Sequence, residues 1–354
     1  MKVISLVGAR PQFIKEAVIQ KEWRKHRIQE VLVHSGQHYG KEMSDTFFRS
    51  LNISKTHYNL HVGSGTHAEM TGKIMIGFEK IVGMEKPDVV IVFGDTNTTL
   101  AGALVSRKLK IKVAHIEAGV RTNTTDMPEE INRIIVDRIS SFLFCPSKLA
   151  LENLKKEGVG DHAYFVGDTM LDLFLKTQRH FSYSEFEKNL LEENNFILAT
   201  IHRDYNVDNP DVLKKILESL LKINKRKKIV FSIHPRTKKR IREFSFEKYL
   251  KHIIVIPPLD YLSAMGLLKK AEFVITDSGG FQKEAYYARK RAFILMPDTG
   301  WKELIYNGWN VLCNSDNIYD ALFDSQNTKY IPNIYGDGWA SKKIVEILLD
   351  NLRI

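Results

Sequence analysis

The chain has 354 residues, of which 44% are hydrophobic and 27% are charged, and its formal net charge is +10. This composition is typical of a globular protein and excludes collagen-like, disordered and membrane-bundle classes, and the length predicts about two domains. Only two cysteines occur, Cys145 and Cys313. We therefore expect a cytoplasmic location, with no disulfide scaffold and no thiolate metal site.

Short apolar runs alternate with amphipathic stretches along the first half of the chain. The runs predict strands at Val3–Val7, Val31–His34, Val89–Phe93, Val113–Ile116, Phe142–Cys145 and Tyr164–Val166. The stretches between the runs predict helices, among them Gln12–His26 and Thr98–Lys108.

The same alternation continues through the second half. The apolar runs there predict strands at Phe196–Ile201, Ile229–Ile233, Ile253–Ile256, Phe273–Thr276 and Phe293–Met296. Helices are predicted between them, for example at Asp211–Ile223 and Tyr261–Lys269. Alternation of this kind indicates an α/β fold with parallel sheets that are covered by helices on both faces.

The strand signal is weakest near Thr177–Asn194, which is polar and resembles a helix. We place a boundary there between two doubly wound domains, residues 1–177 and 178–338. A last helix is predicted at about Trp339–Leu352, after the turn Tyr335-Gly336-Asp337-Gly338.

Polar or charged residues follow most of the predicted strands, and most of these segments include glycine. These segments are Gly8-Ala9-Arg10-Pro11, His34-Ser35-Gly36-Gln37-His38, Gly94-Asp95-Thr96-Asn97, Glu117-Ala118-Gly119-Val120-Arg121, His202-Arg203, His234-Pro235-Arg236 and Asp277-Ser278-Gly279-Gly280. Ligands bind at the carboxyl ends of strands in doubly wound sheets. We therefore expect these segments to face one central cleft between the two domains.

The segment Thr276-Asp277-Ser278-Gly279-Gly280 lies between a predicted strand and the helical pattern Phe281–Ala288. Its glycines and the following helix N-terminus are suited to a phosphate group. In the alternative interpretation, Ser278 only caps the helix. The fingerprints GxGxxG and GxxxxGK[ST] are absent, so we expect neither a nicotinamide cofactor nor P-loop chemistry.

Cations and carboxylates occupy several other strand ends. Arg10 and Lys15 could bind a diphosphate, or could lie on the outer face of a helix. Asp95, Glu117 and Glu129 could act as acids and bases, or could serve as helix caps. His202 could donate to a phosphate or carry a proton, or could be structural.

Other classes of site find little support in the sequence. The chain has no HExxH, CxxC or Asp-x-Asp ligand set, so we expect no metal. It also has no GxSxG nucleophile elbow. The basic runs at 225–228 and 236–240 lack interleaved aromatic residues, and the strand-end carboxylates would repel a phosphate backbone. We therefore expect these runs to be solvated surface, with neither nucleic acid nor membrane as a partner.

In combination, the motifs and their spacing resemble the UDP-N-acetylglucosamine 2-epimerases over nearly the whole chain. The resemblance rests on Gly8–Pro11, Gly36–His38, Gly94–Ala101, His115–Arg121, Met127–Arg133, Val166–Met170, His202-Arg203, Thr276–Glu284 and Tyr335–Gly338. It implies two Rossmann-like domains of the glycosyltransferase-B type, with UDP held mainly by the second domain. It also implies that the final helix, within residues 339–354, packs back on the first domain.

The resemblance further implies inversion at C2 of a UDP-linked 2-acetamido sugar, by elimination and re-addition of UDP through 2-acetamidoglucal. No cofactor is implied, and a homodimer is expected. The matching positions are Asp95, Glu117, Glu129 and His202 for catalysis, and Arg10, Lys15, His202, Ser278, Gly279, Gly280 and Glu284 for UDP binding, with Glu284 on the ribose. The positions that we single out as candidate regulatory residues are Gln37, His38, Arg203 and His234.

The expected substrate pair is UDP-GlcNAc and UDP-ManNAc, for surface polysaccharide precursors. Gln12-Phe13 and Trp301 depart from the best-known bacterial members. They resemble the branch that acts on UDP-2,3-diacetamido-2,3-dideoxyglucuronate, which is the first alternative. A glycosyltransferase of the same architecture is the second.

Overall fold

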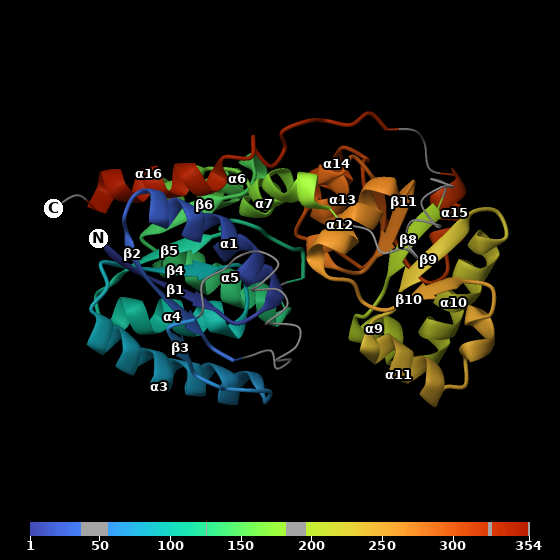
Figure 1. Ribbon diagram of the computed structural model, residues 1–354, viewed down its shortest axis with the longest axis horizontal. Helices are drawn as coiled ribbons and strands as arrows, with labels where there is room; N and C mark the ends of the chain where they lie inside the picture. The colour runs from blue at the N-terminus through green and yellow to red at the C-terminus, as the bar shows by residue number, and fades with distance from the viewer. Residues whose placement is uncertain (37–55, 125, 182–195, 325–327, 353–354) are drawn as a thin grey trace. The chain divides into compact units, whose positions relative to one another are not determined.

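The computed structural model describes residues 1–36, 56–124, 126–181, 196–324 and 328–352. The chain forms two compact units (Figure 1). Unit 1 comprises Met1–Lys176 and Asn333–Ile354, and unit 2 comprises Thr177–Pro332. The candidate residues Gln37 and His38 lie outside the described residues.

The sheet of unit 1 is parallel throughout. Its seven strands are, in spatial order, β3 (Tyr58–Asn59), β2 (Gln29–His34), β1 (Lys2–Val7), β4 (Val89–Phe93), β5 (Lys112–Ile116), β6 (Phe142–Cys145) and β7 (Ala163–Phe165). The strand order reverses between β1 and β4, where Ser5 pairs with Ile91. Because ligands of doubly wound sheets bind where the strand order reverses, we expect the segments after β1 and β4 to carry functional residues.

Helices of unit 1 lie on both faces of this sheet, as Figure 1 shows. They are α1 (Arg10–Lys25), α3 (His67–Glu85), α4 (Asn97–Lys108), α5 (Pro128–Ile139), α6 (Lys148–Lys156), α7 (Thr169–Thr177) and α16 (Ala340–Leu352), with a 3-10 turn at Gly160–His162. The C-terminal helix α16 packs against α1. Its first turn is held by Asp172, which accepts from the backbone N–H groups of Ala340 at 3.0 Å and Ser341 at 2.7 Å.

The strands of unit 1 are rich in valine and isoleucine, which suit a pleated surface that is buried on both faces. One core cluster joins Ile4, Leu6, Val90 and Val92 to α3 through Phe78. The helices thus shield the apolar faces of the sheet, and the carboxyl ends of the strands are left to carry the polar motifs.

Unit 2 has a second parallel sheet, of six strands. In spatial order they are β10 (Ile254–Ile256), β9 (Lys228–Ser232), β8 (Phe196–Thr200), β11 (Phe273–Thr276), β12 (Arg291–Leu295) and β13 (Val311–Cys313). The order reverses between β8 and β11, where Thr200 pairs with Thr276. The segments that begin with His202 and Asp277 therefore leave adjacent strands.

The helices of unit 2 are α9 (Asp204–Val207), α10 (Pro210–Asn224), α11 (Pro235–Glu243), α12 (Tyr261–Lys270), α13 (Gly279–Tyr287), α14 (Lys302–Tyr306) and α15 (Ile318–Asp324), with 3-10 turns at Gln178–His180 and Glu247–Leu250. Helix α10 shows how the sequence specifies them. Asn209 caps its first turn and Pro210 is its first residue. Its buried residues recur at helical spacing and join the core: Leu213, Ile216, Leu217, Leu220 and Ile223.

The structure agrees with the predicted strands and adds short edge strands that the sequence pattern did not predict. These are β3, of two residues, and β13, of three. Strand β3 has too few residues to show an alternation, whereas β13 is as long as β7 and β10, which the apolar runs did predict. Helix α13 begins at Gly279 rather than Phe281, since Ser278 already caps it. In the described residues no helix has the length and apolar character that spanning a membrane requires.

Candidate active site

Asp95 follows β4 and is held from α5. Arg133 of α5 forms an ion pair with its carboxylate, and Asn132 Nδ2 donates to the Asp95 backbone carbonyl at 2.8 Å. Burial opposes the charge on Arg133, but the carboxylates of Asp95 and Glu130 outweigh burial and raise its pKa. Arg133 therefore stays charged and fixes the Asp95 side chain, which is 25% exposed.

Glu117 follows β5 and pairs with a buried lysine. Lys15 Nζ lies 2.8 Å from Glu117 Oε1, and the Lys15 side chain is only 3% exposed. The Glu117 backbone has a φ of 75°, a left-handed conformation that costs a non-glycine residue about 1–3 kcal/mol. A backbone hydrogen bond of 3.1 Å from Glu117 to the Phe144 carbonyl helps to hold it.

Gly94 allows this pair to form beside Asp95. Its φ is 62°, and a Cβ there would lie 3.3 Å from Glu117 Oε1 and 3.6 Å from Lys15 Nζ. A side chain at this position would therefore crowd the Lys15–Glu117 pair.

Glu129 is the second residue of α5 and is partly exposed. Among the described residues it has no hydrogen-bond partner, in contrast to its neighbour Glu130, which accepts from the Thr122 backbone at 3.0 Å and from Arg133 at 2.9 Å. A carboxylate in the first turn of a helix is favoured by the helix dipole. Glu130 is thus a structural group, and Glu129 remains accessible to a ligand.

Gln12 of α1 links two of the strand-end segments, a role that sequence reasoning missed. Its Oε1 accepts from the backbone N–H groups of Gly8 at 2.7 Å and Ala9 at 3.0 Å. Its Nε2 donates to the Phe93 carbonyl at 2.8 Å, and also to the hydroxyls of Thr96 and Thr99. The segment that carries Arg10, the first residue of α1, is therefore tied to the segment that carries Asp95.

In unit 2, Asp277 organises the segment after β8. Its carboxylate accepts from the backbone N–H groups of His202 at 2.9 Å and Arg203 at 2.8 Å, and from Asn206 Nδ2 at 3.0 Å. Burial disfavours the charged form of Asp277, but the hydrogen bonds and the charge of His202 outweigh burial and lower its pKa. Sequence reasoning placed Asp277 in the phosphate turn without giving it this function.

His202 is oriented by the same carboxylate. Its Nδ1 lies 3.0 Å from Asp277 Oδ1, so the N–H at Nδ1 donates to the carboxylate and Nε2 is the nitrogen that can meet a ligand. The ring of His234 lies 5.3 Å from that of His202, centroid to centroid. Burial, and then the charge of His202, lower the pKa of His234.

The remaining candidates of unit 2 surround the first turn of α13. Ser278 caps this helix by accepting from the Phe281 backbone at 3.4 Å, and Gly279 and Gly280 form its first positions. Capping leaves N–H groups of the first turn directed outward, which suits a phosphate group as well. Glu284 is a buried residue of the same helix.

Trp301 supports this turn from outside the helix. Its Nε1 donates to the Gly279 carbonyl at 2.8 Å, and its ring lies 3.8 Å from Nζ of the buried Lys283. The sequence marked Trp301 only as a departure from related chains. No local pattern could have shown that Trp301 is bonded to the first turn of α13.

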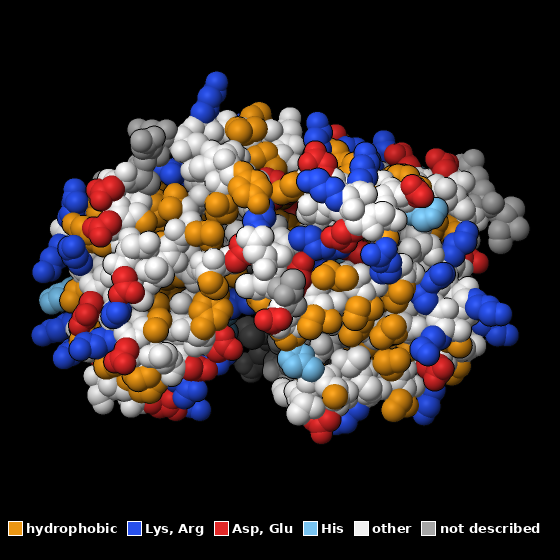
Figure 2. Space-filling model, turned by 180° about the vertical axis from the view of Figure 1, so that it is seen from behind, with side chains coloured by type: hydrophobic (Ala, Val, Ile, Leu, Met, Phe, Trp, Pro, Cys, Tyr) orange, Lys and Arg blue, Asp and Glu red, His pale blue; other side chains and the backbone are white. Residues whose placement is uncertain are grey.

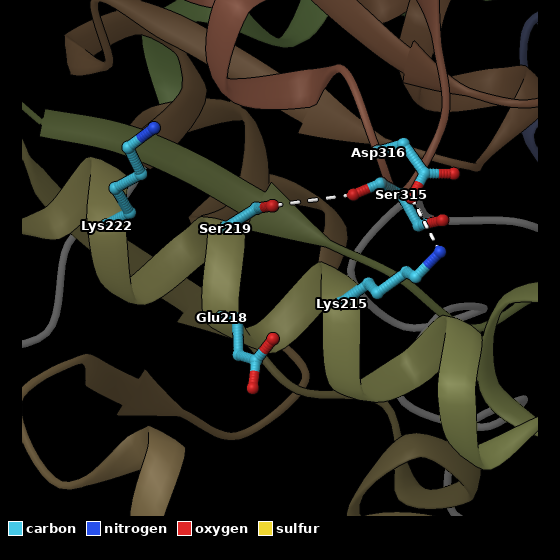
Figure 3. Close-up of a pocket in the computed structure, with 6 residues that line it drawn as sticks. All are labelled: Lys215, Glu218, Ser219, Lys222, Ser315 and Asp316. Atoms are coloured by element: carbon cyan, nitrogen blue, oxygen red, sulfur yellow. Dashed lines mark hydrogen bonds and ion pairs between the residues drawn. The ribbon is translucent and has the colours of Figure 1, made fainter.

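Two other surface features of the described residues lie apart from these groups. An open pocket on unit 2 is lined by Lys215, Glu218, Ser219, Lys222, Ser315 and Asp316 (Figure 3). Its charges are largely matched, as in the 2.7 Å ion pair between Lys215 and Asp316. On the face drawn in Figure 2, basic side chains are interspersed with acidic ones rather than gathered in one stripe. In the described part of the chain, no three His, Cys, Asp or Glu side chains gather as a metal site requires.

A family model described as UDP-N-acetylglucosamine 2-epimerase matches residues 21–349. Over 98% of its length the chain is 42% identical to a UDP-N-acetylglucosamine 2-epimerase of Methanocaldococcus jannaschii, covering 99% of that protein. It is 41% identical to a UDP-2,3-diacetamido-2,3-dideoxy-D-glucuronate 2-epimerase of Pseudomonas aeruginosa, again over 98% of this chain and 99% of that one.

Solved structures give the same result. The crystal structure of the M. jannaschii UDP-GlcNAc 2-epimerase in complex with UDP-GlcNAc and UDP has a TM-score of 0.90 and 42% identity, covering 99% of this chain and 100% of that one. The Neisseria meningitidis UDP-GlcNAc 2-epimerase bound to UDP-GlcNAc has a TM-score of 0.89 and 31% identity, with the same coverage.

Proposed function

The chain belongs to the UDP-N-acetylglucosamine 2-epimerase family, and we propose that it interconverts UDP-GlcNAc and UDP-ManNAc without hydrolysis. The reaction removes the C2 proton and eliminates UDP, so that 2-acetamidoglucal remains bound. UDP then adds back to C1 while a proton returns to the opposite face of C2.

The proton steps are assigned to unit 1. Removal and return of a proton from opposite faces need at least two acid or base groups. Asp95, Glu117 and Glu129 supply three carboxylates, of which Asp95 is held by Arg133 and Glu117 by Lys15. Lys15, expected from the sequence to bind the diphosphate, is paired in this structure with Glu117. It would therefore act on the charge of that carboxylate.

UDP binding is assigned to unit 2. The first turn of α13, with Ser278, Gly279 and Gly280, offers backbone N–H groups to the diphosphate. His202, oriented by Asp277, would stabilise the charge that develops on the departing UDP. Glu284 would hold the ribose hydroxyls, and Arg10 would add a cation to the diphosphate.

The observation that carries this proposal is the placing of Asp95 and Glu117 at adjacent strand ends, each held by a charged side chain. The test is to incubate the protein with UDP-GlcNAc in deuterated water. Deuterium at C2 and formation of UDP-ManNAc are the expected result. Turnover that yields free ManNAc and UDP, or sugar transfer without exchange at C2, would contradict the proposal.

A second substrate is favoured by the 41% identity to the diacetamido-glucuronate 2-epimerase and by Gln12-Phe13 and Trp301. A uronate would bring a second carboxylate that a buried site must pair with donors. The two UDP-sugars are to be supplied separately and their kcat/KM values compared. A site of this kind can produce a difference of roughly 10⁴-fold in kcat/KM. The UDP-sugar with the higher kcat/KM is then the substrate.

The cellular location, oligomeric state, pathway and regulation of this activity are also proposals. We propose a cytoplasmic homodimer that supplies precursors of surface polysaccharide, in keeping with the family resemblance. Binding of a second substrate molecule is proposed to involve Gln37, His38, Arg203 and His234. Analytical ultracentrifugation would test the dimer, and a sigmoidal dependence of rate on UDP-GlcNAc would test the regulation.

A further inference from the structure

A buried histidine, His115, connects the segments that carry Asp95 and Glu117. It lies on β5 and is fully buried. Its Nε2 is 2.7 Å from the Gly94 carbonyl, and its Nδ1 is 2.7 Å from Asp137 Oδ1 on α5. Gly94 directly precedes Asp95, so one bond of this ring reaches the backbone of a proposed catalytic residue.

Asp137 extends the connection to the other segment. Its second oxygen accepts from the Gly119 backbone N–H at 3.1 Å and from Arg121 Nη1 at 2.7 Å. Gly119 lies two residues after Glu117, and both have a left-handed backbone. Arg121 is fixed in turn by two bonds of 2.7 Å to the carboxylate of Glu157.

The orientation of the ring follows from its two partners. A backbone carbonyl only accepts, so Nε2 must carry a hydrogen. Burial disfavours ionisation of Asp137, but the charges and hydrogen bonds of His115 and Arg121 outweigh burial and lower its pKa. The carboxylate of Asp137 anchors the ring at Nδ1, and the ring thereby presents Nε2 to the Gly94 carbonyl.

We infer that His115 is a positioning residue, which sets the placement of Asp95 through the Gly94 carbonyl and is itself anchored by Asp137. This inference rests on the proposed function, because it gives Asp95 and Glu117 a catalytic role. His115 does not itself reach the substrate, since it is fully buried. Its contribution is to hold the Gly94 carbonyl, and with it the backbone that carries Asp95.

Two substitutions separate the two bonds of the ring. His115→Gln places an amide N–H near the position of Nε2, so it can keep the bond to Gly94 and lose the one to Asp137. His115→Asn places its amide near Nδ1, so it can keep the bond to Asp137 and lose the one to Gly94. If the role of His115 is only structural, kcat should be lower in His115→Gln. If His115 positions Asp95, kcat should be lower in His115→Asn.

Positioning predicts that His115→Asn is the less active variant. Its kcat should fall by roughly 10²-fold with little change in KM, since misplacing a catalytic group by about 1 Å can cost that much. His115→Gln should stay within about tenfold of the unmodified protein. The melting temperature should be lower for His115→Gln than for His115→Asn. His115→Gln leaves the buried Asp137 carboxylate short of a donor, and this costs more stability than leaving the Gly94 carbonyl short of one.

Asp172→Asn is the matched control, since Asp172 is a buried aspartate of unit 1 that accepts backbone N–H groups far along the chain from Asp95. It should lower the melting temperature without lowering kcat. Asp137→Asn keeps the ring bond to Gly94 if His115 then accepts from the amide, so it should retain kcat within about tenfold.

The outcomes are distinguishable. A kcat for His115→Asn that equals or exceeds that of His115→Gln would overturn the positioning role. If His115→Asn does not fold, a 10²-fold loss of kcat in well-folded Asp137→Asn or His115→Gln would overturn it instead. Absence of C2 exchange in the unmodified protein would instead count against the proposed function.

Discussion

At the scale of single residues, Glu16 is placed unfavourably for a charged group. It lies on α1 next to Lys15, yet its side chain is fully buried. Both carboxyl oxygens lack a hydrogen-bond partner among the described residues. Burial, and then the negative charge of Glu30, raise the pKa of Glu16 well above its ordinary value.

Glu16→Met is expected to stabilise the protein most at alkaline pH. Because the pKa of Glu16 is higher in the folded state, the folded state binds more protons than the unfolded state. The stability contributed by the protonated group is therefore lost as the pH rises from the pKa of Glu16 in the unfolded state towards its pKa in the folded state. At pH 8 the variant should gain about 1–3 kcal/mol, the usual cost of an unpaired buried polar group, and the gain should shrink near pH 5.

Urea unfolding at pH 5 and pH 8 would measure this difference, with the exposed Glu79→Gln as a control. An equal effect of Glu16→Met at both pH values would show that Glu16 is not protonated in the folded chain.

The three proposed catalytic carboxylates should differ in their effect on stability. Asp95→Asn, Glu117→Gln and Glu129→Gln are each expected to lower kcat by at least roughly 10²-fold. Glu117→Gln should also lower the melting temperature, because it leaves Lys15 buried without its carboxylate. Glu129→Gln should not, because no described residue bonds to Glu129. Near-normal turnover of all three amide variants would end the assignment.

At the scale of elements, α1 is attached to the sheet through its first turn. Gln12 accepts from the N–H groups of Gly8 and Ala9 and donates to the end of β4. Helix α5 makes a similar attachment, since Asn132, Arg133 and Asp137 all reach the segments that follow β4 and β5. These two helices hold the strand-end segments through side chains, in addition to the backbone bonds from Gly94 to Ile116 and from Glu117 to Phe144.

Gln12→Leu is expected to destabilise the protein by roughly 1–3 kcal/mol, because the backbone N–H groups of Gly8 and Ala9 lose their acceptor. The kcat should fall as well, since the segment that carries Asp95 is no longer tied to α1. Thermal unfolding and steady-state kinetics would measure both effects, with the exposed Gln29→Leu as a control. A variant that lost stability but kept full kcat would show that Gln12 acts on the fold alone.

At the scale of the whole molecule, three hydrophobic core clusters of the described residues each lie within one unit. The cluster around Leu217, Phe231 and Phe293 lies in unit 2, while those around Phe78 and around Leu143 lie in unit 1. Each unit has a core large enough for cooperative unfolding by itself.

Calorimetry is therefore expected to resolve two unfolding transitions. UDP should raise the midpoint temperature of the transition that belongs to unit 2. A concentration of UDP 100 times its Kd should stabilise unit 2 by about 2.7 kcal/mol. His202→Ala should weaken UDP binding and reduce this shift, and it should slow elimination as well. An unchanged shift and an unchanged rate in His202→Ala would make His202 a structural residue.

Much of this protein was determined by its sequence alone. Apolar runs of three to six residues with amphipathic stretches between them predicted both parallel sheets, because strand and helix periodicities are local properties. The family could be identified from the motifs, because the short polar segments follow the strands in a fixed order. Strand β3 escaped prediction because two residues show no alternation, while β13 was missed although β7 and β10, also of three residues, overlap predicted runs.

The tertiary structure decided which of these residues meet. Lys15 and Glu117 are 102 positions apart, and Asp95 and Arg133 are 38 apart. No local pattern specifies such pairs, because they depend on the order of the strands in the sheet and on the packing of α1 and α5. For the same reason, the sequence placed His115 in a strand but could not show that its ring joins Gly94 to Asp137.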